Sequence, residues 1–223
     1  MIVICTHKSP QILETMLESI EKKSENHKIL IVETSESQES CDIASRHKCI
    51  FTNTNLKYEI GAYNHALNMF PNEQEYFMFQ DSLEILKSGW EDVFRRLSKG
   101  EKMVSLCSYA LLDDPCPGCG KDVFEQLFGL EFPVNNASGV LANSFYIPIS
   151  AKNKLKEFGI EKLLANNKND TYGTERILGA MAYYACGYDD LSTELGNYIW
   201  SVDRFLPDIG FTQYIQKNIP KRQ

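Results

Sequence analysis

Short apolar runs alternate with longer amphipathic stretches through the first half of the chain. The apolar runs are rich in β-branched and aromatic residues, which is typical of buried strands, and they cover residues 2–6, 28–32, 49–52, 75–80 and 103–107. Between them, apolar residues recur at helical spacing, which predicts helices that begin at residues 10, 39, 59 and 90. This alternation predicts an α/β fold with a mainly parallel sheet and helices on both faces.

The second half has a weaker pattern. Residues 113–121 are dense in Asp, Pro, Gly and Cys and predict a loop. Beyond it we expect a strand over 139–147 and helices over 150–158 and 174–184. The chain shows no internal repeat, low-complexity tract or linker, so the sequence predicts one continuous domain over 1–223.

Composition narrows the possible functions. The 223 residues carry a formal net charge of −7, which argues against a general binder of nucleic acid or anionic membrane, because such binding depends on Lys and Arg. No run approaches the roughly 18 apolar residues of a membrane-spanning helix, and the first apolar run is too short for a signal peptide. The seven cysteines suggest no disulfide framework. We therefore expect a cytoplasmic protein.

Polar residues follow three of the predicted strands at the point where each strand ends. Ligands of open α/β sheets bind outside the carboxyl ends of the strands, so we expect these residues to share one edge of the sheet. They are Thr6, His7 and Lys8, then Glu33, Thr34 and Ser35, and finally Asp81, Ser82 and Glu84.

The order of these motifs resembles the GT-A nucleotide-sugar glycosyltransferases, in particular the inverting, family-2-like group. The resemblance covers residues 1–97 well and 139–187 more loosely. The chain is similar to the small single-domain members found in bacteria and in large algal viruses. The segments that carry it are Ile-Cys-Thr-His-Lys at residues 4–8, Ile-Val-Glu-Thr-Ser at 31–35, Tyr58 to Leu67, and Phe79 to Leu86 with Trp90 beyond.

The resemblance implies a Rossmann-like GT-A fold. Residues 1–108 would form the nucleotide-sugar-binding half and residues 109–223 the acceptor-binding half. If the chain is viral, its compartment would be the host cytoplasm. The basic, polar end at residues 217–223 is compatible with one part of a larger multidomain protein.

The same resemblance implies which residues meet the donor. Glu33 would bind the base, at a position where the family usually has Asp. The helix that contains Gly61 and Asn64 would lie beside the donor, near Gln80. The residues that line the nucleotide pocket would be Thr6, His7 and Lys8.

A metal site is also implied. Asp81 matches the first acid of the family's Asp-x-Asp motif, which holds Mg²⁺ or Mn²⁺ against the donor diphosphate; a divalent cation neutralises the charge of the departing nucleoside diphosphate. Leu83 stands at the third position, so either Asp81 binds the metal alone or Glu84 is recruited. The late His ligand of many relatives has no counterpart, because the four histidines are His7, His27, His47 and His65.

The family's general base is an acid at a helix start after the acceptor loop. Glu175 matches it within Thr-Tyr-Gly-Thr-Glu-Arg, and Asp170 is the reserve. The base would take the proton from an acceptor hydroxyl as that oxygen attacks the anomeric carbon, and direct displacement would invert the configuration. Arg176 replaces the usual second acid.

Plainer interpretations stay open for these residues. Asp81 could be a helix N-cap or a turn residue, and Glu33 a solvated turn acid. Glu175 could be a favourable first-turn acid of its helix. Cys116 and Cys119 form a Cys-x-x-Cys pair that could be redox-active or half of a zinc site, although a loop is the simpler interpretation.

The sequence thus predicts a glycosyltransferase that moves a sugar from a nucleoside-diphosphate sugar, with a UDP-sugar as first choice, to a hydroxyl on a glycan or other acceptor. One alternative is a nucleotidyltransferase, but these enzymes usually carry a Gly-rich basic loop after the first strand, where this chain has Thr-His-Lys-Ser-Pro. The other alternative is a non-catalytic nucleotide-sugar or glycan-binding module, which Leu83 keeps open.

Overall fold

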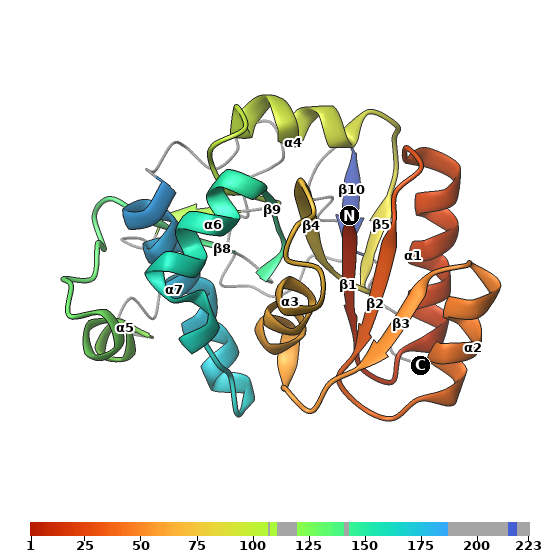
Figure 1. Cartoon of the computed structure of the whole chain (residues 1–223), viewed down its shortest axis with the longest axis horizontal. Helices are drawn as coiled ribbons and strands as arrows, with labels where there is room; N and C mark the ends of the chain where they lie inside the picture. Colours follow the sequence, from red (N-terminus) through yellow and green to blue (C-terminus); the bar gives the residue numbers. More distant parts are fainter. Residues whose placement is uncertain (107, 111–119, 141–142, 187–213, 218–223) are drawn as a thin grey trace, which may run out of the picture.

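A six-stranded sheet forms the centre of the molecule (Figure 1). The computed structural model describes residues 1–106, 108–110, 120–140, 143–186 and 214–217. The strand order is β3-β2-β1-β4-β9-β6. The bounds are β1 Ile2–Thr6, β2 Ile29–Glu33, β3 Ile50–Asn53, β4 Glu75–Gln80, β9 Phe145–Pro148 and β6 Val104–Ser105.

The first four strands of this order run parallel, whereas β9 is antiparallel to both β4 and β6. The prediction of a mainly parallel sheet is therefore confirmed. The parallel strands are buried on both faces, which explains why each one appears in the sequence as a nearly continuous apolar run.

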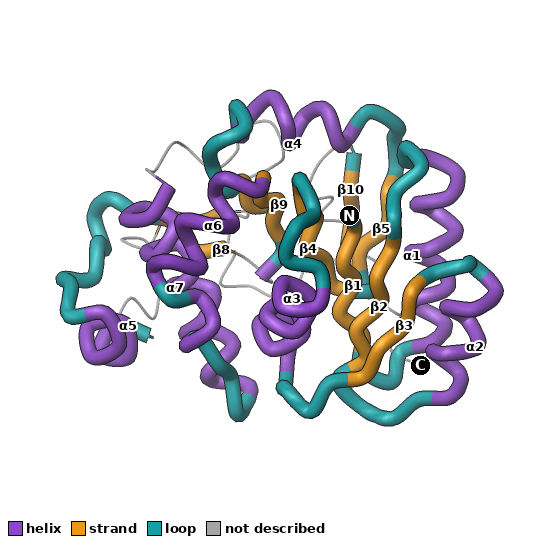
Figure 2. The backbone as a smooth tube through the Cα atoms, viewed as in Figure 1, coloured by secondary structure: helices purple, strands orange, loops and turns teal. Residues whose placement is uncertain are grey.

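Helices cover both faces of the sheet, as predicted (Figure 2). One face packs against α1 Pro10–Lys23, α2 Gln38–Arg46 and α4 Trp90–Ser98. The other packs against α3 Tyr58–Met69, α5 Lys121–Phe128, α6 Ile149–Phe158 and α7 Lys168–Cys186, with a short 3₁₀ helix at Ile160–Lys162. Alternate residues of β1 serve the two cores, since Ile2 and Ile4 face the first group of helices and Val3 and Cys5 the second.

The carboxyl ends of three parallel strands are level with one another. Thr6 in β1 lies opposite Glu33 in β2, and Cys5 lies opposite Gln80 in β4. The pairing continues one residue beyond the strands, because the Thr34 amide donates to the Thr6 carbonyl at 3.1 Å. The residues that follow these strands therefore meet at one edge of the sheet.

Two of the elements predicted for the second half have different bounds in the structure. The strand expected over 139–147 is wrong: β8, Ser138–Val140, pairs with β7, Ser108–Ala110, while β9 joins the main sheet. The helix expected from 174 begins at Lys168. The structure also adds α5 and the antiparallel pair of β5, Leu83–Ile85, and β10, Ile215–Lys217.

Cys116 and Cys119, with most of the predicted loop, lie outside the described residues. No helix in the described part of the chain is long and apolar enough to cross a membrane.

Candidate active site

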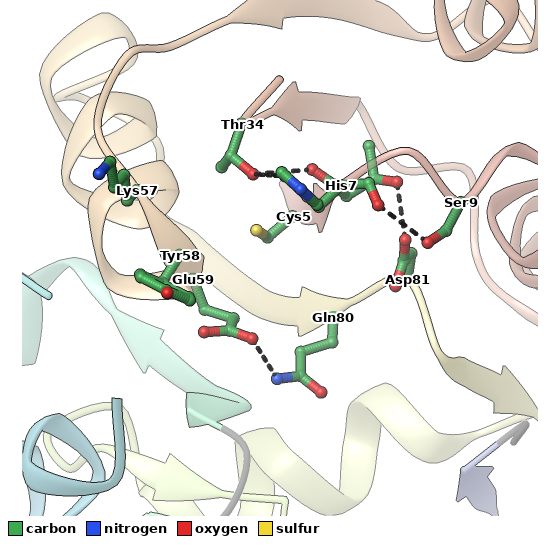
Figure 3. Close-up of a pocket in the computed structure, with 10 residues that line it drawn as sticks. Cys5, His7, Ser9, Thr34, Lys57, Tyr58, Glu59, Gln80 and Asp81 are labelled. Atoms are coloured by element: carbon green, nitrogen blue, oxygen red, sulfur yellow. Dashed lines mark hydrogen bonds between the residues drawn. The ribbon is translucent and has the colours of Figure 1, made fainter. Parts of the chain in front are cut away.

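A cavity of about 500 Å³ opens at the carboxyl edge of the sheet, where β1, β2 and β4 end and α3 begins (Figure 3). Four predicted site residues share this cavity, namely Thr6, His7, Gln80 and Asp81. The other residues that line it are Cys5, Ser9, Thr34, Lys57, Tyr58 and Glu59. The cavity therefore lies where the predicted strands end, and four of the predicted residues form part of its wall.

Side-chain hydrogen bonds tie the three strand ends together. The ring Nδ1 of His7 lies 3.1 Å from the Thr34 hydroxyl, which donates to the Thr6 carbonyl at 3.3 Å. The Thr6 hydroxyl in turn donates to Oδ2 of Asp81 at 2.7 Å. These contacts fix the relative positions of the loops that follow β1, β2 and β4, so the wall of the cavity is largely pre-organised.

Asp81 is a half-buried carboxyl group in an acidic environment. Burial raises the pKa of Asp81 to about 6, and the nearby charges of Glu33 and Glu59 act in the same direction. The hydrogen bond from Thr6 opposes this rise of the pKa because it stabilises the charged form. Asp81 starts a turn that leads into β5 rather than a helix, so the N-cap interpretation is wrong.

Glu33 is fully buried and is not among the residues that line the cavity. Its Oε1 accepts hydrogen bonds from the Lys8 amide at 3.3 Å, the Ser35 amide at 3.1 Å and the Ser35 hydroxyl at 2.5 Å. Its Oε2 has no hydrogen-bond partner among the described residues. The interpretation as a solvated turn acid is therefore wrong. Through these hydrogen bonds Glu33 connects the loop after β1 to the loop after β2. Its contact with the base of a nucleotide stays a prediction.

The start of α3 supplies a carboxylate that the sequence analysis did not assign. Oε1 of Glu59 accepts a hydrogen bond of 2.6 Å from Nε2 of Gln80 (Figure 3). Tyr58, the residue before it, has a φ of 59°, which is a strained backbone conformation for a bulky side chain. Only the contact with Gln80, 21 positions away, reveals a role for Glu59.

Gly61 and Asn64 lie in α3 but do not line the cavity. A Cβ on Gly61 would come within 2.8 Å of Cβ of Leu56, so the glycine lets the segment before α3 pack closely. Asn64 is buried, and its Nδ2 donates to the carbonyls of Ile160 at 3.2 Å and Leu163 at 3.1 Å. Both residues support the wall of the site, and direct contact with a donor stays a prediction for each.

Glu84 lies in β5 and is not among the residues that line the cavity. Its backbone pairs with Gln216 of β10, and its neighbours Leu83 and Ile85 are buried in the core. Leu83, which stands at the third position of the acidic motif, is therefore a core residue.

The two candidate bases belong to α7. Because α7 begins at Lys168, Glu175 lies inside the helix, and its expected position at a helix start is wrong. Asp170 is in the first turn, where Oδ2 accepts hydrogen bonds from the amides of Asn166 at 2.8 Å and Asn167 at 3.3 Å. The first turns of α7 lie on the same side of the molecule as the carboxyl edge of the sheet (Figure 1). Neither carboxylate lines the cavity.

The donor set for a metal is small but suitable. Within the part of the chain that the structure describes, no three His, Cys, Asp or Glu side chains gather closely enough to hold an ion. Asp81 and Glu59 both line the cavity. Mg²⁺ is commonly held by one or two carboxylates, with water and substrate phosphates completing the shell. Asp81, the acid of the motif, therefore fits a cation whose other ligands come from a diphosphate and water.

The chain matches no protein-family model and no curated protein by sequence. Its structure is similar to that of galactosyltransferase LgtC in complex with donor and acceptor sugar analogues, with a TM-score of 0.50 and 9% identity over 81% of this chain and 70% of that one. The fold is the GT-A fold.

Two further solved structures that are similar to this chain, with lower TM-scores, are those of synthases of glycosylated phosphoglycerate. Mannosyl-3-phosphoglycerate synthase from Rubrobacter xylanophilus has a TM-score of 0.49 and 13% identity over 81% of this chain and 72% of that one. Glucosyl-3-phosphoglycerate synthase from Mycobacterium tuberculosis, crystallised with Mn²⁺, UDP and glucosyl-3-phosphoglycerate, has a TM-score of 0.48 and 9% identity over 85% and 80%. The likeness to the galactosyltransferase, at 9% identity, shows the fold alone, and the reaction must be argued from the site.

Proposed function

We propose that this protein is a glycosyltransferase that moves a sugar from a nucleoside-diphosphate sugar, with a UDP-sugar as the preferred donor, to a hydroxyl on a glycan or other acceptor. Mn²⁺ or Mg²⁺ assists the transfer. The observation that carries the proposal is the cavity at the carboxyl edge of a GT-A fold, in which Asp81 of the motif is fixed by Thr6.

The cavity offers features that suit a diphosphate. The N-terminal ends of α1 and α3 both reach it through Ser9 and Lys57, and neither of these N-cap residues caps its helix with its side chain. An uncapped helix N-terminus attracts anions through its amide groups and the helix dipole. Lys57 also brings an exposed, positively charged side chain to the rim of the cavity.

The carboxylates need a cation before they can face a diphosphate, because like charges would otherwise repel. Asp81 is the residue that would hold Mn²⁺ or Mg²⁺, with the diphosphate and water as the other ligands. When bound, such an ion neutralises negative charge that develops on the departing nucleoside diphosphate. Thr6 keeps Asp81 oriented, and Gln80 does the same for Glu59.

The acceptor is assigned to residues 109–223, with Glu175 as the base that takes the proton from the attacking hydroxyl. Asp170 is the less suitable of the two, because its carboxylate already accepts two backbone amides before α7. In-line attack by the hydroxyl oxygen would invert the anomeric configuration, which NMR of the product detects.

A thermal-shift screen of nucleoside diphosphates and their sugars, with and without Mn²⁺, tests the proposal. A ligand that binds only the folded state raises the unfolding midpoint by mass action. We expect UDP or a UDP-sugar to raise the midpoint in a Mn²⁺-dependent way, and slow release of UDP from the sugar to accompany it. A nucleoside triphosphate as the preferred ligand would favour a nucleotidyltransferase. Binding without any turnover would favour a non-catalytic module, and no shift with any nucleotide would refute the proposal.

A further inference from the structure

One wall of the cavity combines an aromatic ring, a carboxylate and an amide. Tyr58 and Glu59 begin α3, and Gln80 ends β4. All three residues are half-buried and line the cavity. Figure 3 shows them next to one another along one side, with His7 and Ser9 on the opposite side. Tyr58 is the only Phe, Tyr or Trp among the described residues that line the cavity.

The hydrogen bond between Gln80 and Glu59 leaves two oxygen acceptors for a ligand. Nε2 of Gln80 donates to Oε1 of Glu59 at 2.6 Å, which orients both side chains. Within the described part of the chain, Oε2 of Glu59 makes no hydrogen bond, and Oε1 of Gln80 accepts only a long one, of 3.4 Å, from the Ser82 hydroxyl. An ionised carboxylate accepts hydrogen bonds and donates none. This wall therefore suits a ligand group that donates, as sugar hydroxyls do and phosphate oxygens do not.

The ring of Tyr58 is held in this wall in a strained backbone conformation. Its φ is 59°, a value that bulky side chains rarely adopt. Such conformations persist where the surroundings enforce them, and they cluster at ligand-binding sites. Tyr58 packs against the core beneath α3 and also lines the cavity. A flat apolar ring beside two oxygen acceptors matches a sugar, which carries C–H groups on its faces and hydroxyls around its edge.

The position of this wall in the sheet favours the transferred sugar over the ribose of the nucleotide. Gln80 ends β4, the last of the parallel strands, and the next strand in the sheet is β9 of the second half. α3 likewise packs against α7. Because the acceptor is assigned to residues 109–223, the sugar that meets it has to lie on this side of the diphosphate. The nucleoside then lies on the side of β2, near Thr34.

We propose that Tyr58, Glu59 and Gln80 form the subsite for the transferred sugar and select a neutral hexose with unsubstituted hydroxyls. The inference rests on the proposed function, and it names the class of sugar that the donor carries. Glu59 accepts hydrogen bonds from the sugar hydroxyls, Gln80 orients Glu59, and Tyr58 packs against a face of the sugar ring. A uronic acid would place a second carboxylate beside Glu59, and like charges repel, so an acidic sugar is disfavoured.

Calorimetric titration with UDP, UDP-glucose, UDP-galactose and UDP-glucuronic acid in the presence of Mn²⁺ tests this assignment. The parent should bind at least one of the two neutral sugar nucleotides more tightly than UDP-glucuronic acid. We expect Glu59→Gln to weaken binding of that neutral sugar nucleotide by about tenfold, to change binding of UDP by less than about twofold, and to reduce the discrimination against the acidic sugar. If the parent prefers GDP to UDP, the corresponding guanosine compounds are used.

Three further variants separate a binding role from a structural one. Tyr58→Leu keeps an apolar side chain but loses the flat ring, so it should weaken the neutral sugar nucleotide and spare UDP, whereas Tyr58→Phe should bind both like the parent. Glu36→Gln removes an exposed carboxylate outside the cavity lining and is the matched control for Glu59→Gln. Gln at position 59 keeps an oxygen that can accept from Gln80, so the fold is expected to survive, and thermal midpoints without ligand check this.

The outcomes distinguish this inference from the proposed function. If Glu59→Gln weakens UDP and the sugar nucleotide equally, the wall binds the nucleoside, and the inference is overturned while the proposed function stands. Parental affinity for both ligands in Glu59→Gln, or a parent that binds UDP-glucuronic acid most tightly, overturns it in the same way. If the parent binds no nucleotide and no nucleotide sugar, the proposed function fails and this inference fails with it.

Discussion

The hydroxyl of Thr6 donates to Oδ2 of Asp81 at 2.7 Å, across the carboxyl ends of two adjacent parallel strands. The contact holds a carboxyl group that burial and two neighbouring acids push toward protonation. An arrangement that disfavours its own charged form in the empty protein is suited to receive a cation. It also makes the stability of the protein depend on pH in a way that can be measured.

Asp81→Asn should stabilise the ligand-free protein above neutral pH. The pKa of Asp81 is about 6 in the folded protein, whereas an unfolded aspartate titrates near 3.9. Between these values the folded state binds more protons, so the free energy of unfolding of the parent decreases as the pH rises from about 4 to about 6. Asn does not titrate, so the free energy of unfolding of the variant does not decrease in this way.

Thermal or urea unfolding from pH 4 to pH 8 checks this prediction. The stability difference between Asp81→Asn and the parent should grow with pH and become constant above pH 7. Asp42→Asn, on the exposed face of α2, is the matched control and should show no such trend. A difference that does not vary with pH would contradict the raised pKa.

Thr6→Val should raise the pKa of Asp81 further, because the variant loses a hydrogen bond to the charged form and keeps the shape of the side chain. The carboxyl carbon of Asp81 can be followed by NMR as a function of pH. Thr34→Val removes a hydroxyl of the same wall that binds the Thr6 carbonyl instead, and it should leave the Asp81 titration in place. An unchanged titration in Thr6→Val would show that the hydrogen bond from Thr6 does not influence the pKa of Asp81.

The parallel half of the fold could be predicted because its strands are buried on both faces and its helices each bury one face. The same pattern placed Thr6, His7, Gln80 and Asp81 at one edge, where they line the cavity. The pattern fails where structure depends on distant partners. β5 is three residues long and pairs with β10, more than 120 positions later, so no local periodicity marks either strand.

The start of α7 shows another limit. Its first turns carry mainly polar residues from Lys168 to Tyr172, which are exposed or half-buried, and the apolar repeat begins only afterwards. Glu175 was consequently placed at a helix start, whereas it lies inside the helix. The sequence pattern does not identify Glu59 as a site residue either. Its place in the cavity wall depends on the hydrogen bond from Gln80, and no spacing within its own helix indicates that contact.

Asn64→Ala should destabilise the protein by about 1–3 kcal/mol, because it removes two buried hydrogen bonds and the donor to the Leu163 carbonyl, while the Ile160 carbonyl keeps the Leu163 amide. These carbonyls belong to Ile160 and Leu163, which lie in the segment before α7. Chemical denaturation measures the loss, with Asn68→Ala as the exposed control in the same helix. A loss of stability equal to that of the control would mean that the two hydrogen bonds contribute little.

Glu175→Gln should leave nucleotide binding intact and lower the rate of sugar transfer by about a hundredfold or more, as the loss of a general base does. UDP release in the presence of acceptor, or slowly to water, provides the assay. Glu157→Gln, on the exposed side of α6, is the control. If Glu175→Gln transfers at the parental rate and Asp170→Asn does not, while both variants keep the parental thermal midpoint, the base is Asp170.

Gly179→Ala should be the most damaging of these changes. A Cβ at position 179 would lie 1.8 Å from the Ser138 carbonyl oxygen, so α7 and β8 could not keep their present contact. Backbone atoms cannot turn aside as a side chain can, and we expect a loss of about 3 kcal/mol or more.

Gly173→Ala in the same helix is the matched control. Its Cβ would meet Cα of Gly120 at 3.6 Å, an ordinary contact, and alanine favours a helix over glycine by about 1 kcal/mol. Denaturation midpoints should therefore fall for Gly179→Ala and stay level or rise for Gly173→Ala. If both variants were equally stable, α7 would have to pack against β8 less closely than the structure shows, and the position of Glu175 relative to the sheet edge would change with it.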